Sequence, residues 1–527
     1  MNERPGMALI ALLSIGLFGF FVFPGRTYLH QDSQIYLPMM ERLVDSHVLG
    51  NDLIATHPHL SFTCYDEIAV GLRKLTGLDF QVILTAQQIV TRLLGLLGVF
   101  LLAQGAGMGY AGSVMVAGLY GLGATIFGPS VLTIEYEPTP RAFALPLALL
   151  AAGLAAKQNW PAAGIAMFAG FLYHPPTVIP VLLPMLIYVS MPWHLEGRWR
   201  FLGWIGAAAL VMAFAAKMQA GVKLEQHFFS RVSPDVEALQ RMRASYVYVG
   251  MWLGQSWGHY LFLAVVSMAA WLRCGEKMEG FARFLLGLLP GIGWASLLFS
   301  WITMDLMGWG LMPQLQPVRA LLWTTLAAVV TCGLAAGFAR GMLERTLWLL
   351  VPFAIAVQTR PLDLLWPSKP DALLHLAIVA VLAAASALAL RLGALAPGIV
   401  AVAAMFLTLY VGGVRNYPQI HSQELDALSE WARASTAVEA VFHFPDAGKE
   451  LYPGIFRAKA ERAVWVDWKG GGQVNFMEPL AREWWKRWSA LPAGTGDFLI
   501  RKSGKCGTSA LYANAKYCVE RPATSIK

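Results

Sequence analysis

The sequence predicts a polytopic α-helical membrane protein of about 13 transmembrane helices that ends in a small α/β domain. Hydrophobic residues make up 57% of the chain and charged residues only 14%, against about 25% charged in ordinary soluble domains. Apolar runs of roughly 17 to 25 residues recur along the first 413 residues, which is the length that a helix needs to cross a bilayer. From about Arg415 the composition changes to that of a globular protein.

These apolar runs are expected to be helices, because in hydrocarbon each segment must satisfy its own backbone hydrogen bonds. The first run is not followed by a small-x-small cleavage site and is expected to remain as an uncleaved helix. The predicted spans fall at 7–23, 82–103, 108–132, 140–156, 160–173, 176–191, 201–216, 250–272, 284–300, 319–338, 346–358, 372–390 and 398–413.

The connections between spans predict which side of the membrane each faces. Trp193–Arg200, Arg273–Arg283, Arg340–Arg345 and Arg391 lie in short, basic connections, as cytoplasmic loops do. The longer inserts at 24–81 and 217–249 then face outward, and so does the C-terminal region. We therefore expect a transmembrane domain over 1–413, with an external loop at 24–81, and an extracytoplasmic domain over 414–527.

The net charge of +8 does not indicate a nucleic-acid-binding protein. The chain has no Lys/Arg-rich run and no stacking motif, and much of its basic excess lies in the short loops. Anionic membrane lipids, or a substrate that carries phosphate, are the partners that this distribution favours.

The tail shows the alternation of a small α/β domain. Residues 422–435 and 482–488 have helical spacing, whereas 440–444, 463–467 and 497–500 resemble strands. Cys506 and Cys518 flank a polar, Gly-containing segment, and a disulfide between them would close a hairpin in an oxidising compartment. Two unrelated thiols are the alternative.

The insert after the first span opens with His30-Gln31-Asp32-Ser33-Gln34. A carboxylate directly after a transmembrane helix is suited to chemistry at the membrane surface. Residues 35–49 have apolar side chains at helical spacing and are predicted to lie along the membrane interface as an amphipathic helix. Asp32 or Ser33 could instead simply cap that helix.

The same insert contains a second group of ionisable residues. These residues could bind zinc, although their spacing is not diagnostic of a zinc site. The residues concerned are His57, His59 and Cys64.

Two further polar clusters are predicted on the same outer side. Arg141 begins a span, where its charge opposes the helix macrodipole, so we expect Glu135 or Glu137 to pair with it. His174, in Tyr-His-Pro-Pro, either ends a helix or lines a polar cavity, since ionisable groups at membrane depth are often functional.

Other outward segments add cations that are suited to phosphate, because arginine binds phosphate in a bidentate manner. A lone cation at the membrane rim more commonly anchors a lipid headgroup. These segments carry Asp305, Arg319, Arg360, Asp363 and Lys369.

A first helix followed by a long external loop with an early acid, Asp32, resembles the C-type (GT-C) membrane glycosyltransferase superfamily. The segments 137–141 (Glu-Pro-Thr-Pro-Arg), 173–176 and 456–469 resemble segments of bacterial relatives. Trp465–Gly470 is similar to the Trp-Trp-Asp-Tyr-Gly signature of oligosaccharyltransferases, but it departs from it at Lys469, which argues against a peptide acceptor.

The resemblance implies an enzyme of the bacterial inner membrane that takes a sugar from a polyprenyl-phosphate-linked donor and transfers it, with inversion, to an envelope glycan or lipid acceptor. Asp32 would be the general base, and Glu137 and His174 would orient the reacting groups. Arg319, with Arg141 or Arg360, would stabilise the leaving phosphate. No cofactor is required, although a divalent metal is possible with this many carboxylates. The alternatives are a transporter or flippase for a lipid-linked or anionic solute, and a non-catalytic scaffold in polysaccharide assembly.

Overall fold

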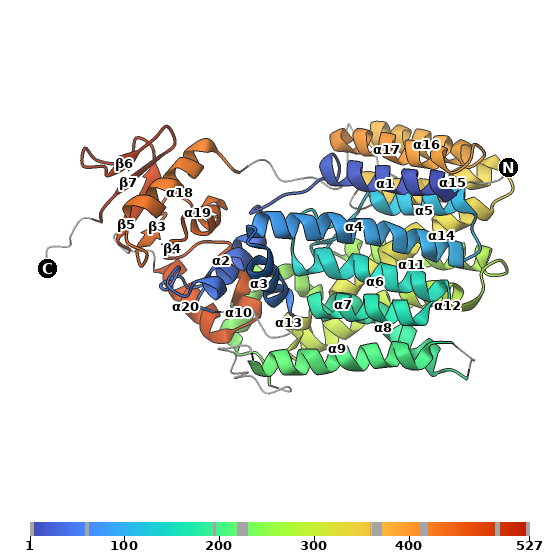
Figure 1. Ribbon diagram of the computed structural model, residues 1–527, viewed down its shortest axis with the longest axis horizontal. Helices are drawn as coiled ribbons and strands as arrows, with labels where there is room; N and C mark the ends of the chain where they lie inside the picture. Colours follow the sequence, from blue (N-terminus) through green and yellow to red (C-terminus); the bar gives the residue numbers. More distant parts are fainter. Residues whose placement is uncertain are drawn as a thin grey trace.

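The computed structural model describes residues 5–57, 63–192, 196–218, 230–358, 360, 372–411, 420–490 and 496–522. A bundle of long helices forms most of the molecule, and a small domain that contains the strands β3 to β7 lies at one end of it (Figure 1). The amino terminus lies near the opposite end, so α1 runs through the bundle towards the small domain. The loops that join the two parts therefore meet at one end of the bundle.

Each of the thirteen predicted apolar runs coincides with a helix. Five helices are long and apolar enough to cross a membrane, and several shorter ones are similarly apolar, as expected of a multi-pass membrane protein. The helices are α1 (Pro5–Phe21), α4 (Phe80–Gly105), α5 (Tyr110–Gly121), α6 (Pro140–Ala156), α7 (Trp160–Tyr173), α8 (Pro175–Ser190), α9 (Arg198–Met218), α11 (Gly254–Cys274), α12 (Gly280–Ser300), α14 (Leu321–Phe338), α15 (Met342–Val357), α16 (Ala372–Ala389) and α17 (Leu395–Val411).

The predicted span over 108–132 is wrong in its second half. Helix α5 ends at Gly121, and the chain then forms a short antiparallel hairpin of β1 (Thr125–Ile126) and β2 (Val131–Leu132). The hairpin is apolar because it is packed inside protein, with Ile126 and Val131 almost fully buried. Non-helical backbone at membrane depth is tolerated where protein surrounds it.

Helix α14 is the centre of the bundle and packs against α5, α11, α12 and α15. Near one edge, α4 and α6 cross at glycines that allow their backbones to touch. A Cβ at Gly98 would lie 2.4 Å from the backbone of Leu149, and a Cβ at Gly153 would lie 2.2 Å from the Gly98 carbonyl oxygen. Small residues at such crossings permit close helix packing. The crossing fixes α6, whose first turn carries Arg141.

The C-terminal domain is built on a five-stranded mixed sheet in the order β4-β3-β5-β7-β6. Strand β3 is parallel to β4 and β5, whereas β5, β7 and β6 run antiparallel. The two predicted helices and the three predicted strands are present, although β4 is shorter than predicted, and α19, β6 and β7 are additional. The elements are α18 (Gln423–Ser435), β3 (Val441–His443), α19 (Tyr452–Ala460), β4 (Ala463–Val464), α20 (Glu478–Ser489), β5 (Phe498–Lys502), β6 (Tyr512–Ala513) and β7 (Tyr517–Glu520).

Helix α2 (Ser33–Val44) follows Asp32 and lies between the bundle and the C-terminal domain. On one side, Leu37 and Met40 share a hydrophobic cluster with Phe442 and Phe456 of the domain. On another side, Ile35 and Met39 pack in a cluster that includes Trp484. The prediction that this helix lies along the membrane interface is therefore wrong for its first two turns, which are buried in protein.

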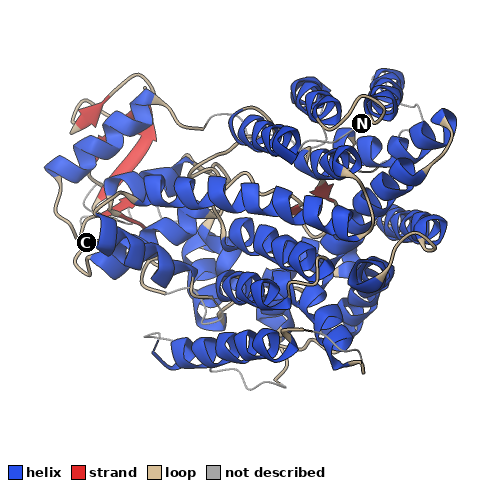
Figure 2. Ribbon diagram, turned by 45° about the vertical axis from the view of Figure 1, so that its right-hand side comes forward, coloured by secondary structure: helices blue, strands red, loops and turns tan. Residues whose placement is uncertain are grey.

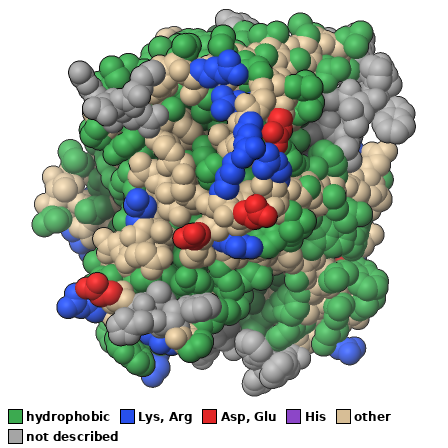
Figure 3. Space-filling view, turned by 90° about the vertical axis from the view of Figure 1, so that its right-hand side faces the viewer, with side chains coloured by type: hydrophobic (Ala, Val, Ile, Leu, Met, Phe, Trp, Pro, Cys, Tyr) green, Lys and Arg blue, Asp and Glu red, His purple; other side chains and the backbone are tan. Residues whose placement is uncertain are grey.

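Basic side chains gather at the end of the bundle away from the C-terminal domain (Figure 3). At this end the α11–α12 and α14–α15 connections are joined by an Arg273–Glu344 ion pair of 2.8 Å and by Lys277, which donates to the Phe338 carbonyl at 2.9 Å. Figure 2 shows the strands of the C-terminal domain at the far end of the helices. Basic loops therefore lie at one end, and Asp32 at the other.

Candidate functional site

Asp32 directly precedes α2 but does not cap it. Its side chain accepts no hydrogen bond from the first turn of the helix. The carboxylate instead pairs with Lys469, with Oδ1 2.6 Å from Nζ, and with Arg141, with Oδ2 3.6 Å from a guanidinium nitrogen. One third of the side chain stays exposed. The helix-cap interpretation of Asp32 is therefore wrong, and its carboxylate is directed at two cations.

Glu137 holds the turn that carries Asp32. Its Oε1 accepts hydrogen bonds from the backbone N–H groups of His30 (2.9 Å) and Gln31 (2.8 Å) and from the Ser33 hydroxyl. Burial raises the pKa of Glu137, and the nearby charge of Asp32 adds to this effect, although the Ser33 hydrogen bond opposes it. Through these bonds Glu137 positions the backbone on both sides of Asp32.

Arg141 lies in the first turn of α6, and Glu135 is the partner that the sequence left open. Arg141 Nε is 3.1 Å from Glu135 Oε1, and both side chains are largely buried. The Glu135 carbonyl is in turn bound by Arg92 of α4, which also donates to the carbonyls of Gly19 and Gly25. Arg92 thus ties the end of α1 to the loop that orients Arg141.

Arg141 and Arg319 line one narrow pocket at this end of the bundle. The Arg319 guanidinium lies 5.8 Å from the Tyr246 ring centre, and its buried Nε has no hydrogen-bond partner among the described residues. The pocket volume is about 10 Å³, which is room for one water molecule. The remaining lining residues are Val131, Leu132, Glu135, Leu145, Pro176, Thr177, Leu322 and Trp323.

Three helices begin at this pocket. Arg141 belongs to the first turn of α6, Thr177 to that of α8 and Leu322 to that of α14. A helix amino terminus carries a partial positive charge, and the two guanidinium groups add to it and outnumber the one carboxylate of the lining, Glu135. The pocket is therefore electropositive and suited to an anion such as phosphate.

The C-terminal domain contributes Lys469, which is held by a buried ion network. Arg457 of α19 pairs with Asp52 of the external loop at 2.7 Å and with Asp467 at 2.5 Å, and all three side chains are almost fully buried. Asp467 also accepts a hydrogen bond from the backbone N–H of Gly470. This network fixes both sides of Lys469 and connects the domain to the loop that carries Asp32.

The charges at the site favour the ionised form of Asp32. Its burial acts to raise its pKa, but the positive charges of Lys469, Arg141 and Arg319 outweigh that effect and hold the pKa below its usual range. Burial would lower the pKa of Lys469, whereas Asp32 raises it. Both groups are therefore charged near neutral pH.

Two other residues named from the sequence have separate partners. His174 caps α8, because its Nδ1 accepts a hydrogen bond from the Thr177 backbone N–H at 3.3 Å. Arg360 donates to Gln255 at 2.9 Å and lies over the Phe127 ring. His174 thus binds Thr177 of the pocket lining, and Arg360 lies beside the tip of the β1–β2 hairpin.

The zinc hypothesis receives no support from the described residues, among which no group of three metal ligands occurs. His59, Asp363 and Lys369 lie outside the described residues. Cys64 is buried with its thiol near Met212 Sδ. In the C-terminal domain, Cys506 and Cys518 form a disulfide.

Sequence reasoning missed the positions of Lys469, Asp52 and Arg457 at the site. Arg92 could have been noticed, because it is the cation inside the apolar run 82–103 and such residues are usually functional or paired. Asp52 and Arg457 lie 405 positions apart, and no local pattern indicates that they meet.

Comparisons with known proteins give structural similarity at low sequence identity. No protein-family model and no curated protein matches the chain. The chain is similar in structure to ArnT from Cupriavidus metallidurans bound to undecaprenyl phosphate, with 14% identity and a TM-score of 0.44 over 99% of this chain and 97% of that one. It is similar to the same protein in the apo state, with 13% identity and a TM-score of 0.40 over 98% and 96%.

The chain is also similar in structure to a mycobacterial arabinofuranosyltransferase, AftD, with 15% identity and a TM-score of 0.39. The match covers 84% of this chain and 31% of AftD. The similarity is one of overall arrangement along the chain. At these identities it says nothing about individual side chains.

Proposed function

We propose that the protein is a membrane glycosyltransferase that moves a sugar from a polyprenyl-phosphate-linked donor to an envelope glycan or lipid acceptor, with inversion, at the outer face of the bacterial inner membrane. The observation that carries the proposal is the electropositive pocket of Arg141 and Arg319, at the start of three helices, beside the ionised carboxylate of Asp32. A lipid phosphate supplies the anion that would pair with Arg319, and Asp32, which contacts Arg141, supplies the base.

In this mechanism the acceptor hydroxyl attacks the anomeric carbon while the bond from that carbon to the phosphate oxygen breaks. Asp32 accepts the hydroxyl proton, and the phosphate leaves with the bonding electrons. A carboxylate of low pKa is a weak base, so proton transfer follows bond cleavage, when the hydroxyl has become acidic. Arg141, Arg319 and the helix termini stabilise the charge that develops on the phosphate.

Two rearrangements must precede the reaction. The pocket has room for only one water molecule, so the side chains of Arg141 and Arg319 must separate to admit a phosphate. Lys469 must release Asp32, whose carboxylate it binds at 2.6 Å. The phosphodiester of the donor carries one negative charge, so it gives these cations a partner other than Asp32, and the phosphate monoester that the reaction releases binds them more strongly.

The orientation of the chain supports an external site. Basic loops lie at the opposite end of the bundle, where the positive-inside rule places the cytoplasm. The disulfide between Cys506 and Cys518 fits an oxidising compartment on the side of Asp32.

The test is the turnover of the purified full chain in proteoliposomes that contain a pool of polyprenyl-phosphate sugars and extracted envelope acceptors, with released polyprenyl phosphate as the readout. We expect Asp32→Asn to lower turnover about 10²- to 10⁴-fold, the range for loss of a general base. Asp79→Asn is the matched control, because Asp79 is an exposed carboxylate at the start of α4. Equal turnover of Asp32→Asn and wild type would remove Asp32 from the mechanism. Movement of the intact donor between leaflets, without release of polyprenyl phosphate, would favour a flippase.

A further inference from the structure

A second cavity lies at the basic end of the bundle, away from Asp32. It is an open groove of about 550 Å³ along the exposed face of α12, between α8 and α11. Gly280 and Leu288 lie at the two ends of the α12 segment that lines the groove. From Gly280 to Leu288 the helix rises about 12 Å, which is enough for a headgroup and the first part of an acyl chain.

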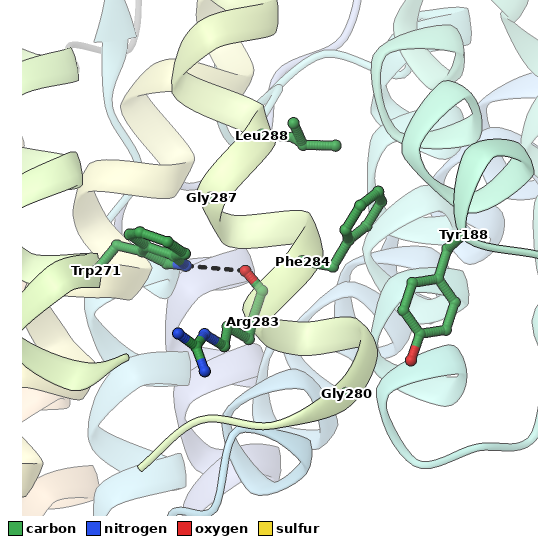
Figure 4. A pocket seen from close by; sticks show the side chains of 7 residues that line it. All are labelled: Tyr188, Trp271, Gly280, Arg283, Phe284, Gly287 and Leu288. Atoms are coloured by element: carbon green, nitrogen blue, oxygen red, sulfur yellow. Dashed lines mark hydrogen bonds between the residues drawn. The ribbon is translucent and has the colours of Figure 1, made fainter. Parts of the chain in front are cut away.

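The walls of the groove are aromatic and fixed in place. Trp271 of α11 donates from Nε1 to the Arg283 carbonyl at 2.9 Å, and its indole packs over Gly287, 3.0 Å from the position that a Cβ would take. Tyr188 of α8 packs against the ring of Phe284 on the other side, with centroids 5.3 Å apart. Figure 4 shows Phe284 and Leu288 extending from α12 towards Tyr188, while Trp271 lies on the opposite side of the helix.

Among the described residues, Arg283 is the one charged residue that lines this groove. Its guanidinium lies 5.8 Å from the Trp271 ring centre, and no ion pair or side-chain hydrogen bond of Arg283 occurs within the described part of the chain. Arg283 is in the first turn of α12, where a positive charge opposes the macrodipole. The neighbouring cations Arg273 and Lys277 already have partners in the α14–α15 connection. Arg283 thus adds a cation that no described side chain neutralises to an end that is already basic.

We propose that this groove binds one anionic glycerophospholipid of the leaflet opposite the Asp32 site, with its phosphodiester on Arg283 and the start of one acyl chain between Trp271 and Tyr188. Charge decides the choice of lipid. A single cation matches the single negative charge of a phosphodiester, whereas the three cations around Asp32 match the dianionic phosphate monoester that the proposed reaction releases. Aromatic walls beside a basic residue are typical of the level at which headgroups meet acyl chains.

The test is photocrosslinking of the purified full chain in nanodiscs of phosphatidylcholine that contain a trace of diazirine-labelled phosphatidylglycerol, followed by peptide mapping. We expect labelled peptides from 271–288, and replacement of a small part of the phosphatidylcholine by unlabelled phosphatidylglycerol should lower their labelling. Arg283→Gln should lower labelling of these peptides about tenfold, and Arg283→Lys should restore most of it. Arg391→Gln, which removes an exposed charge from the same end without lining the groove, should label like wild type.

Equal labelling of Arg283→Gln and wild type would overturn the proposal, and so would labelling that stays constant when unlabelled phosphatidylglycerol replaces part of the phosphatidylcholine. Stronger competition by a polyprenyl phosphate would assign the groove to the lipid carrier and overturn the choice of a phosphodiester. None of these outcomes depends on glycosyltransferase activity, so the groove and the Asp32 site are tested separately.

Discussion

The Nζ atom of Lys469 lies 2.6 Å from Oδ1 of Asp32, although the two residues are 437 positions apart in the chain. The pair joins the C-terminal domain to the loop that follows the first helix. It also neutralises the carboxylate that the proposed reaction needs. The C-terminal domain is therefore part of the candidate site, and its position controls the charge at Asp32.

Replacement of Lys469 by Met should shift the acid limb of activity towards neutral pH. Lys469 helps to hold the pKa of Asp32 below its usual range. Activity is lost as falling pH protonates the Asp32 carboxylate. Because loss of the cation raises the pKa of Asp32, this loss of activity should occur at higher pH in the variant. The measurement is kcat/KM against pH. Lys449→Met is the control, because Lys449 packs on Trp468 of the same segment. An unchanged acid limb would contradict a role for Lys469 at Asp32.

Arg319→Gln should weaken binding of a polyprenyl phosphate about tenfold or more, because Arg319 lines the pocket and no described residue is its hydrogen-bond or ion-pair partner at Nε. Binding can be measured by native mass spectrometry of the full chain. Arg360→Gln removes a charge that lies beside the tip of the β1–β2 hairpin, and this variant should bind polyprenyl phosphate like wild type. Equal affinity for Arg319→Gln would make Arg319 a structural residue.

Arg457→Met should strongly destabilise the attachment of the C-terminal domain. The substitution leaves Asp52 and Asp467 buried without their shared cation, and such losses typically amount to about 3–5 kcal/mol. Limited proteolysis of the domain in the full chain gives the readout. Arg501→Met breaks a more exposed ion pair with Glu520, for which about 0–1 kcal/mol is expected. Equal protection of both variants would show that the buried network does not hold the domain.

The stability of the junction between the loop and the domain should decrease as the pH falls from about 6.5 to 4. His30 stacks on His421 with ring centroids 5.1 Å apart, and burial, with a contribution from His421, lowers the pKa of His30 to about 4. At pH values between the pKa of His30 in the folded protein and its pKa in the unfolded chain, the unfolded chain binds more protons. Acid therefore favours unfolding, by up to about 3 kcal/mol over this range.

Thermal midpoints measured across this pH range should fall less steeply in His30→Gln than in wild type. His47→Gln, at an exposed histidine, should keep the wild-type slope. Parallel slopes in all three proteins would assign the pH dependence to other groups.

In intact cells, a membrane-impermeant maleimide should label this protein only after treatment with an impermeant reductant. Cys506 and Cys518 are joined in a disulfide, and the free thiols of Cys64, Cys274 and Cys332 are buried. Cys518→Ala frees Cys506 and should be labelled without reductant. Labelling that requires permeabilised cells would place the C-terminal domain in the cytoplasm.

The sequence predicted the helices well, because hydrocarbon requires long apolar segments and the chain shows them directly. It failed at 108–132, where hydropathy cannot distinguish a segment that faces lipid from a hairpin such as 125–132 that is buried in protein. It also placed the first turns of α2 on a membrane surface, since an amphipathic pattern does not reveal what covers the apolar face.

For the site, the sequence by itself identified Asp32, Arg141 and Arg319 as unusual, because a charge at the edge of an apolar run needs a chemical reason. Their partners were decided only by tertiary structure. Lys469 and Arg457 come from a domain more than 400 positions after Asp32 and Asp52. Coulomb interactions depend on separation in space, and the folded chain, rather than local sequence, sets that separation.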